Sequence, residues 1–162
     1  VCNASPLIFL SKLDRLHILG RLYSTIVVPR EVEQEVLKDP KKHFEVPALR
    51  EALEKKPFRI AKMAKRPDFP EFGMGMGEIA VLQIALEESI KPVILDDKNA
   101  IRAAKLLKLE PASCPFLLLN ALKFQIISYH EFKVAFDQLL SFNYRISPPL
   151  YGMILEKAKE IS

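Results

Sequence analysis

Five side chains whose oxygen atoms could bind a metal ion lie at positions that a folded chain could bring together: Asn3, Glu35, Glu78, Asp96 and Asp97. Mg²⁺ and Mn²⁺ prefer carboxylate and water oxygens as ligands. An ion held in this way can activate a water molecule and neutralise charge on a phosphodiester during in-line attack. Because converging carboxylates repel one another unless a cation or protons intervene, such a cluster would indicate a metal site.

The predicted elements around these residues favour such a cluster. A short buried strand is predicted at residues 92–95, and Asp96 and Asp97 follow it directly. Glu78 opens a helix after the glycine-containing loop 67–77. In an open α/β sheet, ligands bind in the crevice outside the carboxyl ends of the strands. Carboxylates at strand ends and helix starts are therefore candidates for one shared site.

Each acidic residue also has a simpler explanation. Glu78 is favoured at a helix start by the helix dipole alone, and Glu35 could face solvent from its helix. One of Asp96 and Asp97 is expected to cap the helix that follows. The sequence leaves open which of these two aspartates faces the metal.

Strands alternate with helices along most of the chain. Strands are predicted at residues 1–3, 25–28, 58–61, 92–95 and 109–112. Helices are predicted at residues 7–13, 14–20, 30–37, 48–55, 116–124, 130–140 and 149–160, besides those that begin at Glu78 and after Asp97. Ser5 and Asp14 are the expected N-caps of the first two helices, and Pro6 takes the first helical position. This alternation is typical of a parallel sheet covered by helices.

Bulk composition narrows the class of protein. The 162 residues fit one domain, and an apolar content of 49% argues against disorder. The net charge of +4 suits a polyanionic partner without requiring one. The two cysteines and three histidines lack the spacing of zinc ligands, so a zinc site is not expected. The cysteines are expected to be small core residues of a protein from a reducing compartment. No apolar run approaches the length of roughly 20 residues that is needed to span a bilayer. We therefore expect a cytoplasmic protein without membrane contact.

Two further patterns have both a functional and a structural interpretation. Loop 67–77 contains Gly73, Gly75 and Gly77, which could cradle a phosphate, but no Gly-Lys-Ser/Thr follows, so a flexible entry to the helix is the better interpretation. Residues 55–67 contain six lysines or arginines and no acidic residue, typical of a solvated segment or of a clamp on phosphates.

A second basic pattern lies next to the aspartates. Lys98, Arg102 and Lys105 fall on one face of the helix after Asp97. They could hold RNA phosphates, although a solvated helix face is the better single explanation for them.

Four blocks of sequence, taken in order, resemble the PIN-domain family of metal-dependent ribonucleases, and most closely its branch of prokaryotic VapC-like toxins. VCNASPLI (residues 1–8) resembles the first strand and turn of that family, and VPREVEQEV (28–36) its second strand and acidic helix. GEIA (77–80) and LDDKNAIR (95–102) resemble the third and fourth acidic blocks. The likeness covers about residues 1–125, and residues 126–162 look like a helical extension of the single domain.

The resemblance implies a three-layer α/β/α fold with a central parallel sheet and an acidic pocket that binds Mg²⁺ or Mn²⁺. It implies that Glu35, Glu78 and Asp97 bind the metal or orient water, with Asp96 able to support or replace Asp97. It also implies that the Ser5 hydroxyl orients a carboxylate or phosphate. Relatives cut RNA, often as homodimers, and toxin members are silenced by a cognate antitoxin.

Asn3 departs from the family pattern, because PIN nucleases usually place aspartate at the end of the first strand. Asparagine supplies a neutral oxygen, which should weaken cation binding and the activation of water. Our first hypothesis is therefore an endoribonuclease, the toxin of a toxin–antitoxin pair, with reduced activity. The alternative is a catalytically weak PIN-like module that binds RNA or a protein partner. A nucleotide-binding regulator is a third hypothesis, which rests on the glycine loop alone.

Overall fold

A parallel sheet is assembled around the first three residues of the chain. The computed structural model describes residues 1–39, 41, 43–71 and 73–162. Strand β1 (Ile26–Pro29) pairs in parallel with β2 (Phe58–Ala61), and β3 (Pro92–Ile94) pairs in parallel with β4 (Glu110–Ala112). Residues 1–3 lie between the two pairs and join them.

Backbone hydrogen bonds on both sides of residues 1–3 make this junction. The Cys2 N–H donates to the Val27 carbonyl at 2.9 Å, and the Asn3 N–H donates to the Ile94 carbonyl at 3.0 Å. Cys2 also forms a parallel bridge with Ile94. The resulting order is β2, β1, residues 1–3, β3, β4, which confirms the predicted central parallel sheet.

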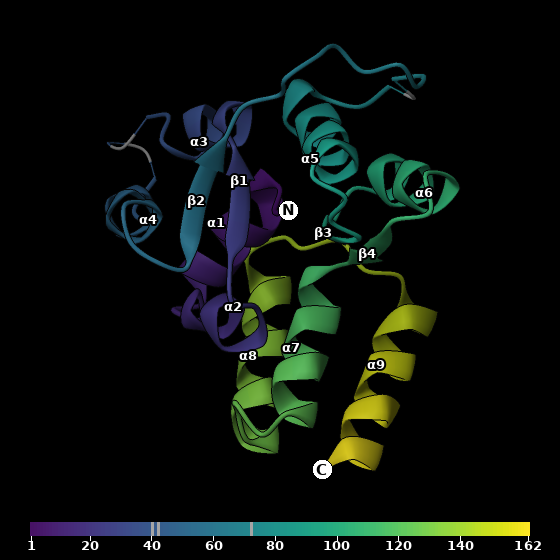
Figure 1. The fold of residues 1–162 in the computed structure, drawn as a ribbon. Helices are drawn as coiled ribbons and strands as arrows, with labels where there is room; N and C mark the ends of the chain where they lie inside the picture. Colours follow the sequence, from purple (N-terminus) through teal and green to yellow (C-terminus); the bar gives the residue numbers. More distant parts are fainter. Residues whose placement is uncertain (40, 42, 72) are drawn as a thin grey trace.

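Helices cover this sheet and extend beyond it (Figure 1). Their bounds are α1 (Ala4–Lys12), α2 (His17–Leu22), α3 (Arg30–Val36), α4 (Val46–Leu53), α5 (Met76–Glu87), α6 (Lys98–Leu106), α7 (Cys114–Lys123), α8 (Tyr129–Ser141) and α9 (Pro148–Ile161). Helix α5 contacts both β1 and β3, and its residues from Ile79 to Ala85 are buried, so it is a central helix. Helices α8 and α9 both pack against α7.

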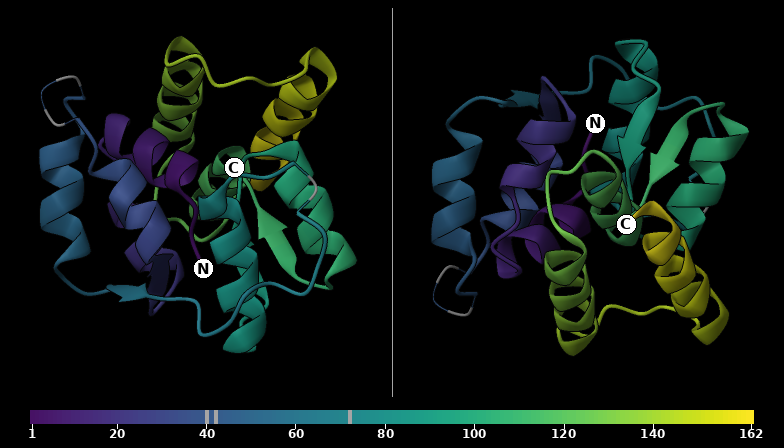
Figure 2. Two further views of the ribbon diagram at one scale, coloured as in Figure 1. Left: turned by 90° about the horizontal axis from the view of Figure 1, so that it is seen from above. Right: turned by 90° about the horizontal axis from the view of Figure 1, so that it is seen from below.

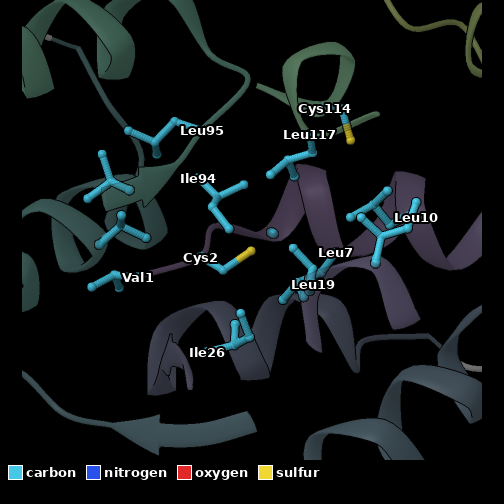
Figure 3. Packing of buried hydrophobic residues seen from close by; sticks show 14 of the residues in the cluster. Val1, Cys2, Leu7, Leu10, Leu19, Ile26, Ile94, Leu95, Cys114 and Leu117 are labelled. Atoms are coloured by element: carbon cyan, nitrogen blue, oxygen red, sulfur yellow. The ribbon is translucent and has the colours of Figure 1, made fainter. Parts of the chain in front are cut away.

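The core forms where the N-terminal segment meets α1, β3 and α7. Figure 3 shows Cys2, Leu7, Ile94 and Leu117 among the apolar side chains gathered there. Cys2 and Cys114 are free and fully buried, as expected for core cysteines. Burial raises the pKa of the Cys2 thiol to about 12, and it raises the pKa of Cys114 well above its usual value.

The starts of the first helices differ from the prediction. Asn3, in extended conformation with φ −87° and ψ 172°, is the N-cap residue of α1, so Ser5 lies inside the first turn and does not cap it. Asp14 has a left-handed φ of 54°, and α2 begins only at His17. Both predictions were wrong because the strand-like segment turns directly into α1 at Asn3, and the chain reverses at Asp14.

The glycine loop ends earlier than predicted. Met76 and Gly77 already belong to α5, whose N-cap residue is Gly75. Position 72 of this loop lies outside the described residues. In the part of the chain that the structure describes, no helix is both long and apolar enough to cross a bilayer.

Candidate active site

The first turn of α5 is the base of the candidate site. Gly75 has an extended backbone before the helix, and its N–H donates to Glu78 Oε2 at 2.7 Å. A carboxylate at this position satisfies one of the backbone N–H groups that a helix start leaves without a partner. This bond fixes Glu78, which is half-buried at the helix start.

Gly77 allows two other candidate residues to approach this turn. A Cβ atom built on Gly77 would lie 3.1 Å from Glu35 Oε2 and 3.3 Å from Asn3 Oδ1. These oxygens come from α3 and from the N-terminal segment, which lie far apart in sequence. The missing side chain therefore leaves space in which Asn3 and Glu35 meet beside Glu78.

Electrostatics links Glu78 to two further carboxylates. Burial is the main cause that raises the pKa of Glu78, and the hydrogen bond from Gly75 opposes it. The negative charges of Asp97 and Glu35 raise the pKa of Glu78 further. The charges of Glu35 and Asp97 therefore each act on Glu78.

Asp97 caps α6 from the end of the β3 segment. Its Oδ1 accepts hydrogen bonds from the Asn99 N–H at 2.8 Å and the Ala100 N–H at 2.9 Å. These bonds use only one carboxylate oxygen, and the side chain is exposed. Asp97 can therefore cap the helix and still present its second oxygen to a ligand.

Asp96 has different partners. Its Oδ1 accepts hydrogen bonds from the Cys114 N–H at 2.8 Å and the Tyr144 hydroxyl at 2.7 Å. Burial raises the pKa of Asp96, and both hydrogen bonds oppose that rise. Asp96 thus ties the β3–α6 turn to α7 and to the segment between α8 and α9.

The structure brings Asn3 and Glu35 together at Gly77, next to Glu78, and the charge of Asp97 acts on Glu78, whereas Asp96 makes its hydrogen bonds elsewhere. Ser5 lies half-buried in the first turn of α1, and its hydroxyl donates no hydrogen bond within residues 1–39, 41, 43–71 and 73–162. Sequence reasoning missed the roles of Gly77 and Tyr144. Gly77 adjoins Glu78 and could have been recognised as a close-approach position, but nothing near Tyr144 in sequence indicates its contact with Asp96.

Two observations bear on whether these residues suit a hard cation. Asn3 Oδ1 is buried and accepts no hydrogen bond within the described part of the chain. Among the same residues, no group of three His, Cys, Asp or Glu side chains is close enough to form a ready ligand set. An ion here would therefore have Asn3 Oδ1 and fewer than three of these carboxylates as ligands in the described arrangement, and water would have to fill the other positions.

Comparison with known proteins identifies the family of the chain. Residues 1–160 match the family described as a PIN domain, and the chain therefore belongs to the PIN-domain family. The matched region includes α8 and α9. No curated protein and no solved structure matches the chain. PIN domains are generally nucleases that use divalent metal ions, so the fold is of the nuclease type.

Proposed function

We propose that this protein is a metal-dependent endoribonuclease that hydrolyses RNA phosphodiester bonds with Mg²⁺ or Mn²⁺. The observation that carries the proposal is the approach of Asn3 Oδ1 and Glu35 Oε2 to Gly77, directly beside Glu78. A buried oxygen without a partner costs roughly 1–3 kcal/mol. A cation or its water at this point would remove that cost for Asn3.

Four residues would hold the ion. Glu35, Glu78 and Asp97 would supply carboxylate oxygens, and Asn3 would supply its amide oxygen. A bound divalent ion would supply positive charge at the attacked phosphate and lower the pKa of a water molecule. Attack of water on phosphorus, with departure of the 3′ oxygen, would leave a 5′-phosphate.

The hydrogen bonds of the chain itself prepare the site. The Gly75 N–H holds one oxygen of Glu78, and the start of α6 holds one oxygen of Asp97. In each case these hydrogen bonds leave the other carboxylate oxygen unused. Carboxylates that are already held in place lose less rotational freedom when they bind an ion, and this preorganisation favours binding.

We further propose that the protein is the toxin of a toxin–antitoxin pair, that it acts in the cytoplasm, and that it forms a homodimer and a complex with its antitoxin. Residues 1–162 then form a single domain, with 1–125 as the core and 126–162 as a helical extension. A neighbouring gene for a small DNA-binding protein, whose product suppresses RNA cleavage, would support this assignment. If no such partner affects cleavage, the toxin assignment fails while the nuclease can stand.

The decisive experiment is cleavage of a mixed RNA pool with Mn²⁺, Mg²⁺ or EDTA. The wild-type protein is compared with a Glu35→Gln, Glu78→Gln, Asp97→Asn triple variant. We expect cleavage that requires the metal and that the triple variant lacks. If the two proteins are equally inert and calorimetry detects no metal uptake, the nuclease proposal is wrong.

Asn3 favours a second candidate function, a catalytically weak module that binds RNA or a protein. Its neutral oxygen stands where the family usually has a carboxylate. The Asn3→Asp substitution distinguishes the two candidates. A large gain in cleavage would identify the wild-type site as weakened, and an unchanged rate would remove Asn3 as a reason for low activity.

A further inference from the structure

The segment between α8 and α9 is attached to the turn that carries the candidate aspartates. The Tyr144 hydroxyl donates to Asp96 Oδ1 at 2.7 Å, across 48 positions of sequence. The Tyr144 ring also packs edge-on against Phe9, with ring centroids 5.2 Å apart. Figure 2 shows this segment running from the end of α8 to the start of α9 along one edge of the molecule. Two contacts therefore fix its position relative to the site.

A cavity lies beside this attachment, at the start of α6. The cavity has a volume of about 470 Å³, and its lining includes Lys98, Tyr144, Arg145 and Ser147. Lys98 directly follows Asp97, the N-cap residue of α6. The cavity therefore begins one residue away from a carboxylate of the acidic cluster.

The charges that line this cavity are positive. Lys98 and Arg145 are both exposed, and the lining contains no acidic residue. Neither side chain forms an ion pair with any other residue that the structure describes. Both cations are thus available to an anionic ligand, with the Ser147 hydroxyl as a further polar group.

A polyanion that approaches the acidic cluster needs such compensation. Phosphates are repelled by Glu35, Glu78 and Asp97, and cations beside the cluster offset this repulsion. The planar guanidinium of arginine donates two parallel hydrogen bonds to one phosphate, and lysine adds a point charge.

We propose that Lys98 and Arg145 form a phosphate-binding subsite for single-stranded RNA, and that Tyr144 is a positioning residue that holds Arg145 there through Asp96. This inference rests on the proposed function, because it gives the same site its substrate contact. It assigns a role to the segment between α8 and α9: these residues complete the site.

The test measures RNA binding without cleavage. A fluorescent single-stranded RNA of mixed sequence is titrated, in EDTA, onto the full chain carrying Glu35→Gln and Glu78→Gln. Arg145→Ala and Lys98→Ala are each added to this background. Arg50→Ala is the matched control, because Arg50 is an exposed arginine of α4, on the opposite side of the molecule from α6 (Figure 1).

We expect Arg145→Ala to weaken RNA binding about tenfold, the scale of one charge-assisted hydrogen bond. The slope of log K against log salt should fall by about 0.7 for each phosphate that the variant no longer neutralises. Arg145→Lys should restore part of the affinity, and Arg50→Ala should leave it unchanged. If Arg145→Ala and Lys98→Ala bind RNA as tightly as their parent, the subsite is refuted.

Tyr144→Phe tests the positioning role, because it keeps the ring against Phe9 and removes only the hydroxyl. We expect weaker RNA binding, and little additional loss when Tyr144→Phe is combined with Arg145→Ala, since both changes act on one contact. Fully additive losses would overturn the positioning role. Thermal unfolding of each variant separates a binding defect from a folding defect.

The outcomes for the subsite and for the nuclease are separate. Binding that depends on Arg145, in a protein that cleaves no RNA with any divalent ion, would support the subsite and refute the nuclease. If cleavage requires the metal but RNA binding is unchanged by Arg145→Ala, the subsite alone is refuted. If polyglutamate binds as tightly as RNA and with the same dependence on Arg145, the subsite recognises an acidic protein segment and the RNA assignment is wrong.

Discussion

Gly77 is the residue on which the proposed site most depends, although it has no functional group. Its Cβ position is only 3.1 Å from Glu35 Oε2 and 3.3 Å from Asn3 Oδ1, and the position is buried. Any side chain there competes directly with the oxygens of the site. The absence of an atom at this point is therefore a requirement of the proposed chemistry.

Gly77→Ala should separate stability from activity. Alanine favours a helix over glycine by about 0.8–1.0 kcal/mol, which offsets part of the cost of moving Glu35 and Asn3. We expect a net stability change within about 1 kcal/mol. Cleavage should fall at least about tenfold, because small misplacements of catalytic groups are costly.

Gly152→Ala in α9 is the matched control, because a Cβ atom there meets no atom within 4 Å. This variant should gain stability from the helix and keep full cleavage activity. Chemical denaturation and the RNA cleavage assay measure the two properties. Equal activity in the two glycine variants would contradict the role of Gly77.

The buried thiols give a second test at the scale of single residues. With a pKa of about 12 for Cys2 and a pKa for Cys114 that is also well above its usual value, both groups remain thiols under mildly alkaline conditions. We expect no alkylation of the native protein by iodoacetamide there, because the thiolate is the nucleophile. Mass spectrometry should find both cysteines modified after unfolding in guanidinium. Rapid alkylation of the native protein would contradict the burial of these residues.

At the scale of elements, helix starts carry much of the proposed site. Glu78 belongs to the first turn of α5, and Asp97 is the N-cap residue of α6. A carboxylate at a helix start interacts favourably with the positive end of the helix dipole. The same two carboxylates therefore stabilise the helix starts and belong to the proposed set of metal ligands.

Substitutions of Asp97 should distinguish these two roles. Asparagine is as good an N-cap as aspartate, whereas alanine costs about 1 kcal/mol. We expect Asp97→Asn to keep the stability of the protein and lose most cleavage, and Asp97→Ala to lose both. Denaturant unfolding and the cleavage assay test this expectation.

Ser128→Ala provides a control at a cap outside the site. The Ser128 hydroxyl accepts from the Glu131 N–H at the start of α8. Its removal should cost about 1 kcal/mol and leave cleavage intact. Full activity in Asp97→Asn would show that its charge is not needed.

The sequence predicted the elements better than their contacts. β-branched and apolar runs located β1 and β3 within one residue or so, because such runs determine which segments are buried in a sheet. The caps at Ser5 and Asp14 were misplaced, because a hydroxyl or carboxylate near a helix start does not show which turn the tertiary structure selects. Asp96 and Asp97 could not be told apart, since the partners of Asp96 lie 18 and 48 positions away.

For the whole molecule, the proposed metal site connects segments that are distant in sequence. Asn3 precedes α1, Glu35 lies on α3, Glu78 on α5 and Asp97 at α6. An ion bound by all of them binds only the folded state. Its binding free energy should therefore add to the stability of the whole domain.

Thermal unfolding with added metal tests this linkage. At a concentration of about 100 times Kd, an ion adds about 2.7 kcal/mol, which corresponds to roughly 5–10 °C in Tm for a domain of this size. We expect Mn²⁺ or Mg²⁺ to raise Tm in the wild type, more strongly in Asn3→Asp, and little in Glu35→Gln/Glu78→Gln. A Tm unaffected by millimolar metal in the wild type would contradict the site.

The central position of residues 1–3 also has a consequence for synthesis on the ribosome. These residues emerge before their partners, yet they pair with β1 and with β3, which begins only at Pro92. The sheet cannot be completed until β4 has emerged as well, near residue 112. Until β3 has emerged, residues 1–3 lack their partners on one side, and the nascent chain exposes an unpaired strand edge that can associate with other chains. A segment that is central in the folded protein is thus among the last to acquire its full set of contacts.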